Sequence, residues 1–289
     1  FNSGTLTNSS IQGGKGADSI SYVSTGTGAT SSILGGLGND TLALGTASTA
    51  IGLTWIAGGA GVDSIMVGSG LSSTATVSGG GGADTIYLGD FGGGVVYGDA
   101  VGTIGAGAGT GSTADGADFI GTTATVGGMA NGAATIYGGG GADTIRLVSA
   151  TLAVSINGGD GADSIRLVEG DSAVSIAGGK GGDTITVNSA ASGVSLSGGL
   201  GNDSLTLNVS TIAIASNLMA GAGTDTVSFM IGDSASTING GGGNDLITTT
   251  GLGATGLASI AGGDGADSIT LVSGGIAAFS INGGNGNDS

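Results

Sequence analysis

The 289-residue chain has no cysteine, no proline and no histidine, and it has only four basic side chains. Without cysteine or histidine it has no zinc site of the usual type, no cysteine nucleophile and no histidine-based triad. Four Lys and Arg residues are too few for the basic face that nucleic-acid binding requires. No run of about 18 apolar residues occurs, so a membrane-spanning helix is not expected. We find no catalytic constellation and expect no enzyme activity from this segment.

What the chain does contain is glycine, aliphatic residues and acid. Glycine accounts for 69 residues, and hydrophobic residues make up 39% of the chain, which is more than a disordered glycine-rich linker would carry. Collagen is excluded because it needs abundant proline as well as glycine. The 21 acidic residues leave a net charge of −17. A compact chain with this charge repels itself unless the charges are spread widely or cations form part of the structure.

One short motif recurs along the whole sequence. It reads Gly-Gly-x-Gly-x-Asp, then Ser or Thr, then an aliphatic residue, as in GGKGADSI from Gly13 and GGDGADSI from Gly158. It returns every ~20 residues, a period that indicates a solenoid. Between Gly79 and Gly138 we interpret about 15 residues, 100–114, as an insertion that splits one turn. The motif supplies thirteen aspartates: Asp18, Asp40, Asp63, Asp84, Asp118, Asp143, Asp163, Asp183, Asp203, Asp225, Asp245, Asp267 and Asp288.

Residues between the motifs alternate between apolar and small polar types, a period of two that is typical of strands. Aliphatic residues stand two residues after each motif aspartate and two residues before each double glycine, as at Ile165 and Ile156. Thr122 and Thr249 are exceptions, four residues after the aspartate. The intervening Ser and Thr residues are expected to face solvent. The pattern predicts an all-β parallel β-solenoid of about 13 coils, with two short strands in each coil.

We predict that residues 1–289 form a single solenoid. No capping segment is visible, and solenoid ends usually need one. The chain is therefore expected to be part of a longer protein, or to abut other subunits.

Stacked coils place the motif aspartates in one column. Carboxylates about 5 Å apart repel by roughly 3–4 kcal/mol at an effective dielectric constant of 20. Lys15, Lys180, Arg146 and Arg166 are too few to compensate such a column. We expect these carboxylates to be exposed and therefore ionised at neutral pH. A divalent cation bound by carboxylate and turn carbonyl oxygens resolves the repulsion, and such an all-oxygen ligand set favours calcium. The alternative is a simple Asx turn without metal.

The strings GGKGADSIS, GGDGADSIR and GGKGGDTIT resemble the haemolysin-type (RTX) calcium-binding nonapeptide. The resemblance implies calcium between stacked turns of a parallel β-roll, held by the thirteen aspartates, less firmly by Asp118 and Asp225. The motif returns once per ~20 residues, so we expect one row of about ten ions along one edge. Ten calcium ions would offset the net charge of −17. This single-row layout is similar to that of bacterial surface-layer proteins and giant adhesins.

The resemblance implies an extracellular, secreted structural protein of a bacterial surface layer, sheath or filament that folds on binding calcium after export. Self-association into a lattice or filament is expected, and cell-surface polysaccharide is a further candidate partner. Two alternatives stay open. The first is an adhesin or ice-binding module that uses the exposed hydroxyl rows. The second is the secretion tract of an exported enzyme whose catalytic domain lies outside these residues.

Overall fold

A computed structural model describes residues 2–4, 6–24, 31–45, 53–68, 71, 74–89, 93–99, 116–122, 134–150, 153–170, 173–188, 193–208, 216–231, 236–252, 257–272 and 278–289. These residues contain 26 β-strands and no helix, and therefore no helix suited to crossing a membrane. They fall into two compact units, residues 1–155 and 156–289. The prediction of a single solenoid stays a prediction.

The strands of the first unit are β1 (Asn2–Gly4), β2 (Ser10–Lys15), β3 (Ser19–Ser24), β4 (Ser31–Leu37), β5 (Thr41–Leu44), β6 (Leu53–Ala60), β7 (Ser64–Val67), β8 (Thr76–Gly81), β9 (Thr85–Leu88), β10 (Gly94–Asp99), β11 (Phe119–Thr122), β12 (Ala134–Gly140) and β13 (Thr144–Ala150). β14 (Val154–Asp160) begins at the end of this unit and lies mostly in the second.

The remaining strands of the second unit are β15 (Ser164–Gly170), β16 (Val174–Lys180), β17 (Thr184–Val187), β18 (Val194–Leu200), β19 (Ser204–Leu207), β20 (Asn217–Ala222), β21 (Thr226–Ile231), β22 (Ser236–Gly242), β23 (Leu246–Leu252), β24 (Leu257–Asp264), β25 (Ser268–Leu271) and β26 (Ala278–Asn285).

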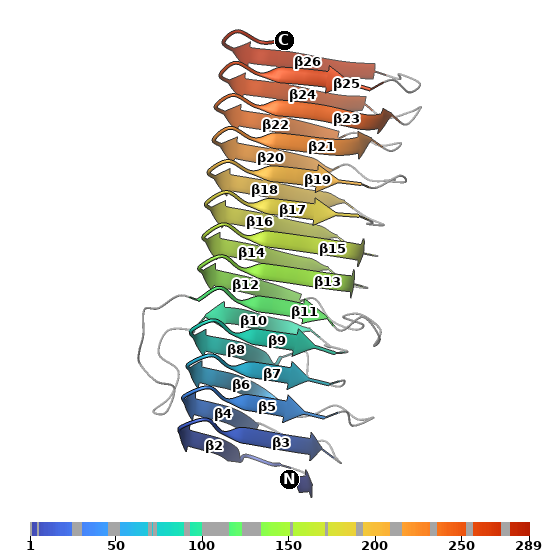
Figure 1. The fold of residues 1–289 in the computed structure, drawn as a ribbon. Helices are drawn as coiled ribbons and strands as arrows, with labels where there is room; N and C mark the ends of the chain where they lie inside the picture. Colours follow the sequence, from blue (N-terminus) through green and yellow to red (C-terminus); the bar gives the residue numbers. More distant parts are fainter. Residues whose placement is uncertain are drawn as a thin grey trace. The chain divides into compact units, whose positions relative to one another are not determined.

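Within each unit the odd-numbered strands form one parallel sheet and the even-numbered strands form another (Figure 1). Each coil contributes one strand to each sheet, and equal repeat positions lie side by side. In the second unit Ile165 pairs with Ile185, and Ile185 pairs with Leu205. The same register holds in the first unit, where Leu42 pairs with Ile65. The predicted all-β parallel solenoid is confirmed.

The motif forms the turn that joins an even-numbered strand to the next odd-numbered strand. The glycines at the second and fourth positions of the motif adopt positive φ angles, for example 123° at Gly36 and 118° at Gly38. These conformations are open to glycine at little cost. In addition, a Cβ atom on Gly36 would fall on the carbonyl oxygen of Gly14 in the preceding coil. The turn therefore needs glycine for its backbone angle and for its close coil-to-coil contact.

The core consists of the predicted aliphatic columns. Ile65, Ile86 and Ile120 from the odd-numbered sheet are fully buried, and so are Ile56 and Val77 from the even-numbered sheet. Full burial of such a side chain contributes about 1.5–3 kcal/mol. Stacking the same column coil upon coil therefore stabilises the repeats, none of which has a core of its own.

The two threonines in the core column are also buried, and the structure shows how. Thr122 and Thr249 are 6% and 0% exposed. The Thr122 Oγ1 accepts a hydrogen bond of 2.8 Å from the backbone N–H of Val148, and the Thr249 Oγ1 accepts one of 3.0 Å from Val272. Each hydroxyl thus satisfies a main-chain donor of the next coil, as a buried polar group must be satisfied.

The proposed insertion, residues 100–114, lies outside the described residues, but both halves of the split turn are described. Phe119 pairs with Thr85 and Ile120 with Ile86, so β11 continues the sheet in register. A Cβ atom on Gly116 would fall on the carbonyl oxygen of Gly82, which is the contact expected of the glycine at the fourth motif position. The two halves therefore occupy the positions of one ordinary turn.

Candidate metal centre

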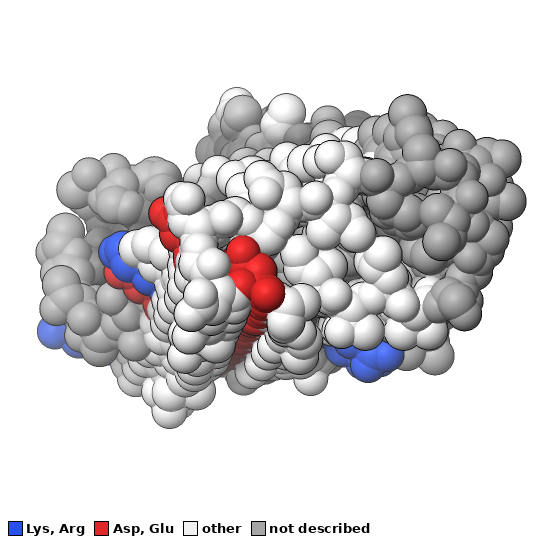
Figure 2. Space-filling model, turned by 90° about the horizontal axis from the view of Figure 1, so that it is seen from above, with Lys and Arg blue, Asp and Glu red and all other residues white. Residues whose placement is uncertain are grey.

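Within each unit the motif aspartates form a column along the edge where the turns lie, and their side chains point inward. Asp18 is partly exposed and Asp288 is exposed, whereas the other eleven are at most 3% exposed. In Figure 2 the carboxylates that are visible lie one behind another between pale ridges of other residues. The column itself was predicted, but the expectation that its carboxylates are exposed is wrong. The backbone of each turn covers them.

One oxygen of each carboxylate joins neighbouring coils. Within each unit, the backbone N–H of a motif aspartate donates to Oδ1 of the motif aspartate in the next coil, at 2.8 Å from Asp183 to Asp203 and 2.7 Å from Asp203 to Asp225. We call this series the aspartate ladder. Eleven such bonds of 2.7–3.1 Å are described, five in the first unit and six in the second.

The other carboxylate oxygen has no such partner. In ten ladder aspartates Oδ2 is buried and makes no hydrogen bond within the described structure: Asp18, Asp40, Asp63, Asp84, Asp118, Asp183, Asp203, Asp225, Asp245 and Asp267. A buried polar atom without a partner costs free energy, and a regular row of them requires an explanation. The row therefore points to a group that the protein chain itself does not supply.

A main-chain oxygen lies beside nine of these ten Oδ2 atoms, all except that of Asp225, whose turn begins with Ala220. At the first motif glycine, Gly13, the point where a Cβ atom would lie is 2.7 Å from Asp18 Oδ2 and 2.5 Å from the carbonyl oxygen of Gly35. The first glycines of other turns, such as Gly58 and Gly178, have the same pair of oxygen neighbours. Each repeat therefore brings one carboxylate oxygen and one carbonyl oxygen of the next coil to the same place.

Main-chain hydrogen bonds also link the turns directly. The N–H of the glycine at the fourth motif position donates to the carbonyl oxygen at the third position in the next coil, as from Gly16 to Leu37 at 2.7 Å. Within each unit, the N–H of the residue after a motif aspartate donates to the aspartate carbonyl of the preceding coil, as from Thr41 to Asp18 at 2.8 Å. These bonds hold the carboxylates in register without fixing their charge state.

Burial raises the pKa values of seven ladder carboxyls: Asp63, Asp84, Asp118, Asp183, Asp203, Asp225 and Asp245. Loss of hydration, opposed by the ladder hydrogen bond and reinforced by repulsion from neighbouring carboxylates, raises the pKa of Asp63, Asp183 and Asp245 to about 6. The same causes raise the pKa of Asp84 to about 7 and that of Asp118 to about 8. In both residues repulsion from Asp99 is a further contribution. The ladder therefore holds its negative charge at a cost near neutral pH.

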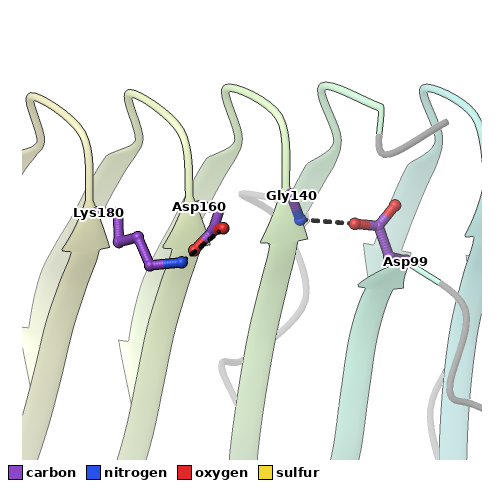
Figure 3. A network of polar contacts seen from close by, with 4 residues as sticks. All are labelled: Asp99, Gly140, Asp160 and Lys180. Atoms are coloured by element: carbon purple, nitrogen blue, oxygen red, sulfur yellow. Dashed lines mark hydrogen bonds and ion pairs between the residues drawn. The ribbon is translucent and has the colours of Figure 1, made fainter. Parts of the chain in front are cut away.

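The four basic residues do not form a matching column. In the second unit Lys180 pairs with Asp160 at 2.9 Å, and both side chains are about two-thirds exposed, at the third position of the turn (Figure 3). Such an exposed pair contributes little to stability. Lys180 also lies outside the ladder, so it does not neutralise the buried carboxylates.

The oxygen atoms of this edge suit a hard cation. Ca²⁺ is bound in proteins by carboxylate and main-chain carbonyl oxygens, which are the two types that converge in each repeat. Within the described residues no three Asp or Glu side chains gather at one point. A cation bound here would therefore depend on turn carbonyls as well as on the ladder aspartates, and the donor set fits that requirement.

The two aspartates in irregular turns belong to the ladder. Asp118, whose turn is split, accepts from Asp84 at 2.7 Å and donates to Asp143 at 2.8 Å. Asp225 follows a turn that begins with Ala220 instead of glycine, yet it is 1% exposed and bonded on both sides. The structure thus places both with the others, although the sequence assigned them less firmly.

Two further groups were missed by reasoning from the sequence. Asn39, Asn202 and Asn244 precede motif aspartates, and the Oδ1 of each accepts the N–H at the same position in the next coil, at 2.8–2.9 Å. The recurrent Gly-Asn-Asp string was the available signal. Asp99 is the second group, a carboxylate in place of the second motif glycine.

No known protein-family model matches this chain, and no curated protein matches it with significant similarity. The fold and the site therefore define its class on their own: a parallel β-solenoid with one buried aspartate per coil, joined in a hydrogen-bonded ladder along the turns.

The turn geometry predicts a sharp contrast between adjacent glycines. Gly241 has φ of 111°, and a Cβ atom there would fall on the Gly221 carbonyl oxygen, whereas a Cβ on Gly242 meets nothing within 4 Å. We expect Gly241→Ala to lower the free energy of unfolding by about 2 kcal/mol or more. Gly242→Ala, the matched control, should unfold at nearly the wild-type temperature in a thermal melt. Equal melting temperatures for the two variants would contradict this turn geometry.

Proposed function

We propose that this chain is a calcium-stabilised structural repeat protein, and that the aspartate ladder is its metal edge. One observation carries the proposal: a row of ten buried Oδ2 atoms without hydrogen-bond partners, nine of them beside a main-chain carbonyl of the next coil. Ten examples of the same unsatisfied atom in the same place are more than local irregularity explains. A cation shared along the row would satisfy all of them.

Calcium suits this edge better than other common metals. The edge offers only oxygen atoms, and the chain has no cysteine or histidine for softer metals. Mg²⁺ demands a tight octahedron and retains its waters, whereas Ca²⁺ accepts irregular sets of six to eight oxygens. The residues that would hold the ion are the thirteen motif aspartates, through Oδ2, together with the carbonyl oxygens of the first motif glycines. When bound, calcium supplies positive charge to a column that has none.

The charge balance makes folding conditional on the ion. Ionised ladder carboxyls destabilise the coiled form, because the folded chain buries them without compensating charge. Where calcium is scarce the chain stays loosely folded, and where it is millimolar, as outside a cell, sites of modest affinity fill and the coils lock together. Ion-gated folding of this type suits a protein that is exported before it folds.

We further propose that the protein is non-enzymatic, is secreted and acts at a cell surface, in a surface layer, sheath or filament related to the RTX repeat proteins. The repeated motif and the solenoid support this assignment. Self-association into a lattice or filament and contact with surface polysaccharide follow as proposed partnerships. The hydroxyl rows leave the adhesin and ice-binding alternatives as predictions.

Calcium titration of the chelated protein tests the proposal. At pH 8 we expect calcium to convert a weakly structured circular-dichroism spectrum into a β-sheet spectrum, and calorimetry to detect several ions per chain. Magnesium at the same concentration should have a much smaller effect. A chain that is fully folded in excess chelator at pH 8, with no calcium bound on titration, would show that the ladder is not a calcium site.

A further inference from the structure

The split turn of the first unit carries an additional carboxylate. In the other turns the second motif residue is glycine, but in the coil of β10 and β11 this position is occupied by Asp99. Asp99 pairs with Gly80 of the preceding coil, as a second-position residue should. Its side chain is partly exposed and lies on the edge that carries the ladder. Among the described residues, the turn of this coil therefore has two acidic side chains, Asp99 and Asp118, where the turns of Asp84 and Asp143 have one each.

The Asp99 carboxylate is held in a defined position. Its Oδ2 accepts a hydrogen bond of 2.6 Å from the backbone N–H of Gly140, the third turn residue of the next coil (Figure 3). The same side chain covers Gly139, where a Cβ atom would collide with its carboxylate carbon at 2.8 Å. These contacts hold the Asp99 side chain against the next coil.

Two orphaned ladder oxygens flank this position. Asp84 and Asp118 are 1% and 2% exposed, and the Oδ2 of each is buried without a hydrogen-bond partner. Asp118 Oδ2 is aimed at Gly98, which directly precedes Asp99, and Asp84 Oδ2 is aimed at Gly79, beside the Gly98 carbonyl oxygen. The negative charge of Asp99 acts on both carboxyls. The split turn therefore adds a third acidic group beside two buried ladder carboxyls.

We infer that the split turn is a distinct cation site, with a higher affinity for calcium than the regular repeats. Its ligands would come from Asp84, Asp118 and turn carbonyls, with Asp99 adding the charge that the regular sites lack. Calcium affinity rises with the number of acidic groups at a site. The inference rests on the proposed function, because it requires that the ladder binds calcium at all. It adds that binding along the row is unequal and begins at this coil.

The tyrosines of the chain provide a local reporter. Only four tyrosines and one tryptophan occur, and none of them is in residues 156–289. Tyr97 lies two residues before Asp99, and its ring stacks on that of Tyr137 with centroids 5.1 Å apart. Tyr87 follows Asp84 by three residues. Terbium bound at the split turn will therefore be sensitised by tyrosine excitation, whereas terbium in the second unit has no tyrosine of that unit near it.

The test is a terbium titration of the full chain, followed by displacement with calcium. We expect a tyrosine-sensitised signal that saturates at lower terbium than total binding measured by calorimetry. Asp99→Asn keeps an oxygen for the Gly140 N–H but removes the charge. It should weaken the sensitised site by about tenfold or more. Asp99→Gly, which restores the usual turn residue, should weaken it equally if the chain folds without that contact.

Matched controls separate this inference from the proposed function. Asp264→Asn removes the same charge from an exposed turn position of the second unit and should leave the sensitised site unchanged. Wild-type affinity in both Asp99 variants, with calcium still bound along the chain, would overturn the inference and leave Asp99 a structural residue. A wild-type chain that binds no calcium would overturn the proposed function as well.

Discussion

The calcium-free protein is expected to lose stability as the pH rises from about 4 to about 8. Unfolded aspartate titrates near 3.8, whereas burial raises the pKa of Asp63 to about 6, of Asp84 to about 7 and of Asp118 to about 8. Between these values the folded chain binds more protons than the unfolded chain, so stability falls with pH. The shift at Asp84 alone corresponds to about 4 kcal/mol. Stability is highest at acidic pH and is lost as these groups ionise.

Thermal melts between pH 4 and pH 9, with and without calcium, measure this effect. Without calcium the melting temperature should fall steadily as the pH rises, until the folded state is largely lost near pH 8. With millimolar calcium the decline should be largely abolished, because the bound ion compensates the ionised carboxylates. Calcium binding near pH 6 to 7 should also release protons, detectable in buffers of different ionisation enthalpy. Stability that rises between pH 5 and pH 8 in chelator would contradict the buried, uncompensated ladder.

A single amide in the ladder is expected to make the protein less dependent on calcium. Asp203 accepts the Asp183 N–H through Oδ1, and its Oδ2 faces the carbonyl oxygen of Ala220. In Asp203→Asn the side-chain oxygen still accepts from Asp183, while the amide NH₂ donates toward Ala220. Without calcium at pH 8 this variant should be more stable than the wild type by about 1–3 kcal/mol, because a buried charge is replaced by a satisfied polar group.

The alanine variant is the control, since it removes the hydrogen bond as well as the charge. Asp203→Ala leaves the Asp183 N–H without its acceptor and should show little of the gain. Calcium titration at pH 8, followed by circular dichroism, distinguishes the variants: Asp203→Asn should reach half-maximal folding at a lower calcium concentration than the wild type does. If Asp203→Asn needs as much calcium to fold as Asp203→Ala does, then the ladder carboxyl is protonated or already compensated, and the charge argument does not hold.

The sequence predicted most of the fold because the repeat carries its own register. A period of two places Ile165 and Leu167 on one face of β15, and the recurring glycine turn sets the length of the coil. Equal positions in successive coils must then stack, which brings Ile185 against Ile165. The column of motif aspartates follows from the same stacking, so the candidate site was also located by the sequence.

The direction of the carboxylates was misjudged, although a signal was present. Asp163 has the same parity as the buried Ile165 and Leu167, so the alternation that buries the aliphatic residues also turns the aspartate inward. Side-chain direction within a turn depends on backbone angles that composition does not specify.

The sequence by itself determined the coil length, the two strands of each coil, the aliphatic columns and the alignment of one aspartate per turn. These follow from local periodicity, which repeats in every coil. Only the tertiary structure decided which carboxylate oxygen joins the ladder and which is left without a partner. It also decided that Asp99 bonds to Gly140 across a split turn. Such contacts join residues 20 to 41 positions apart, and they form only once the coils are stacked at hydrogen-bonding distance.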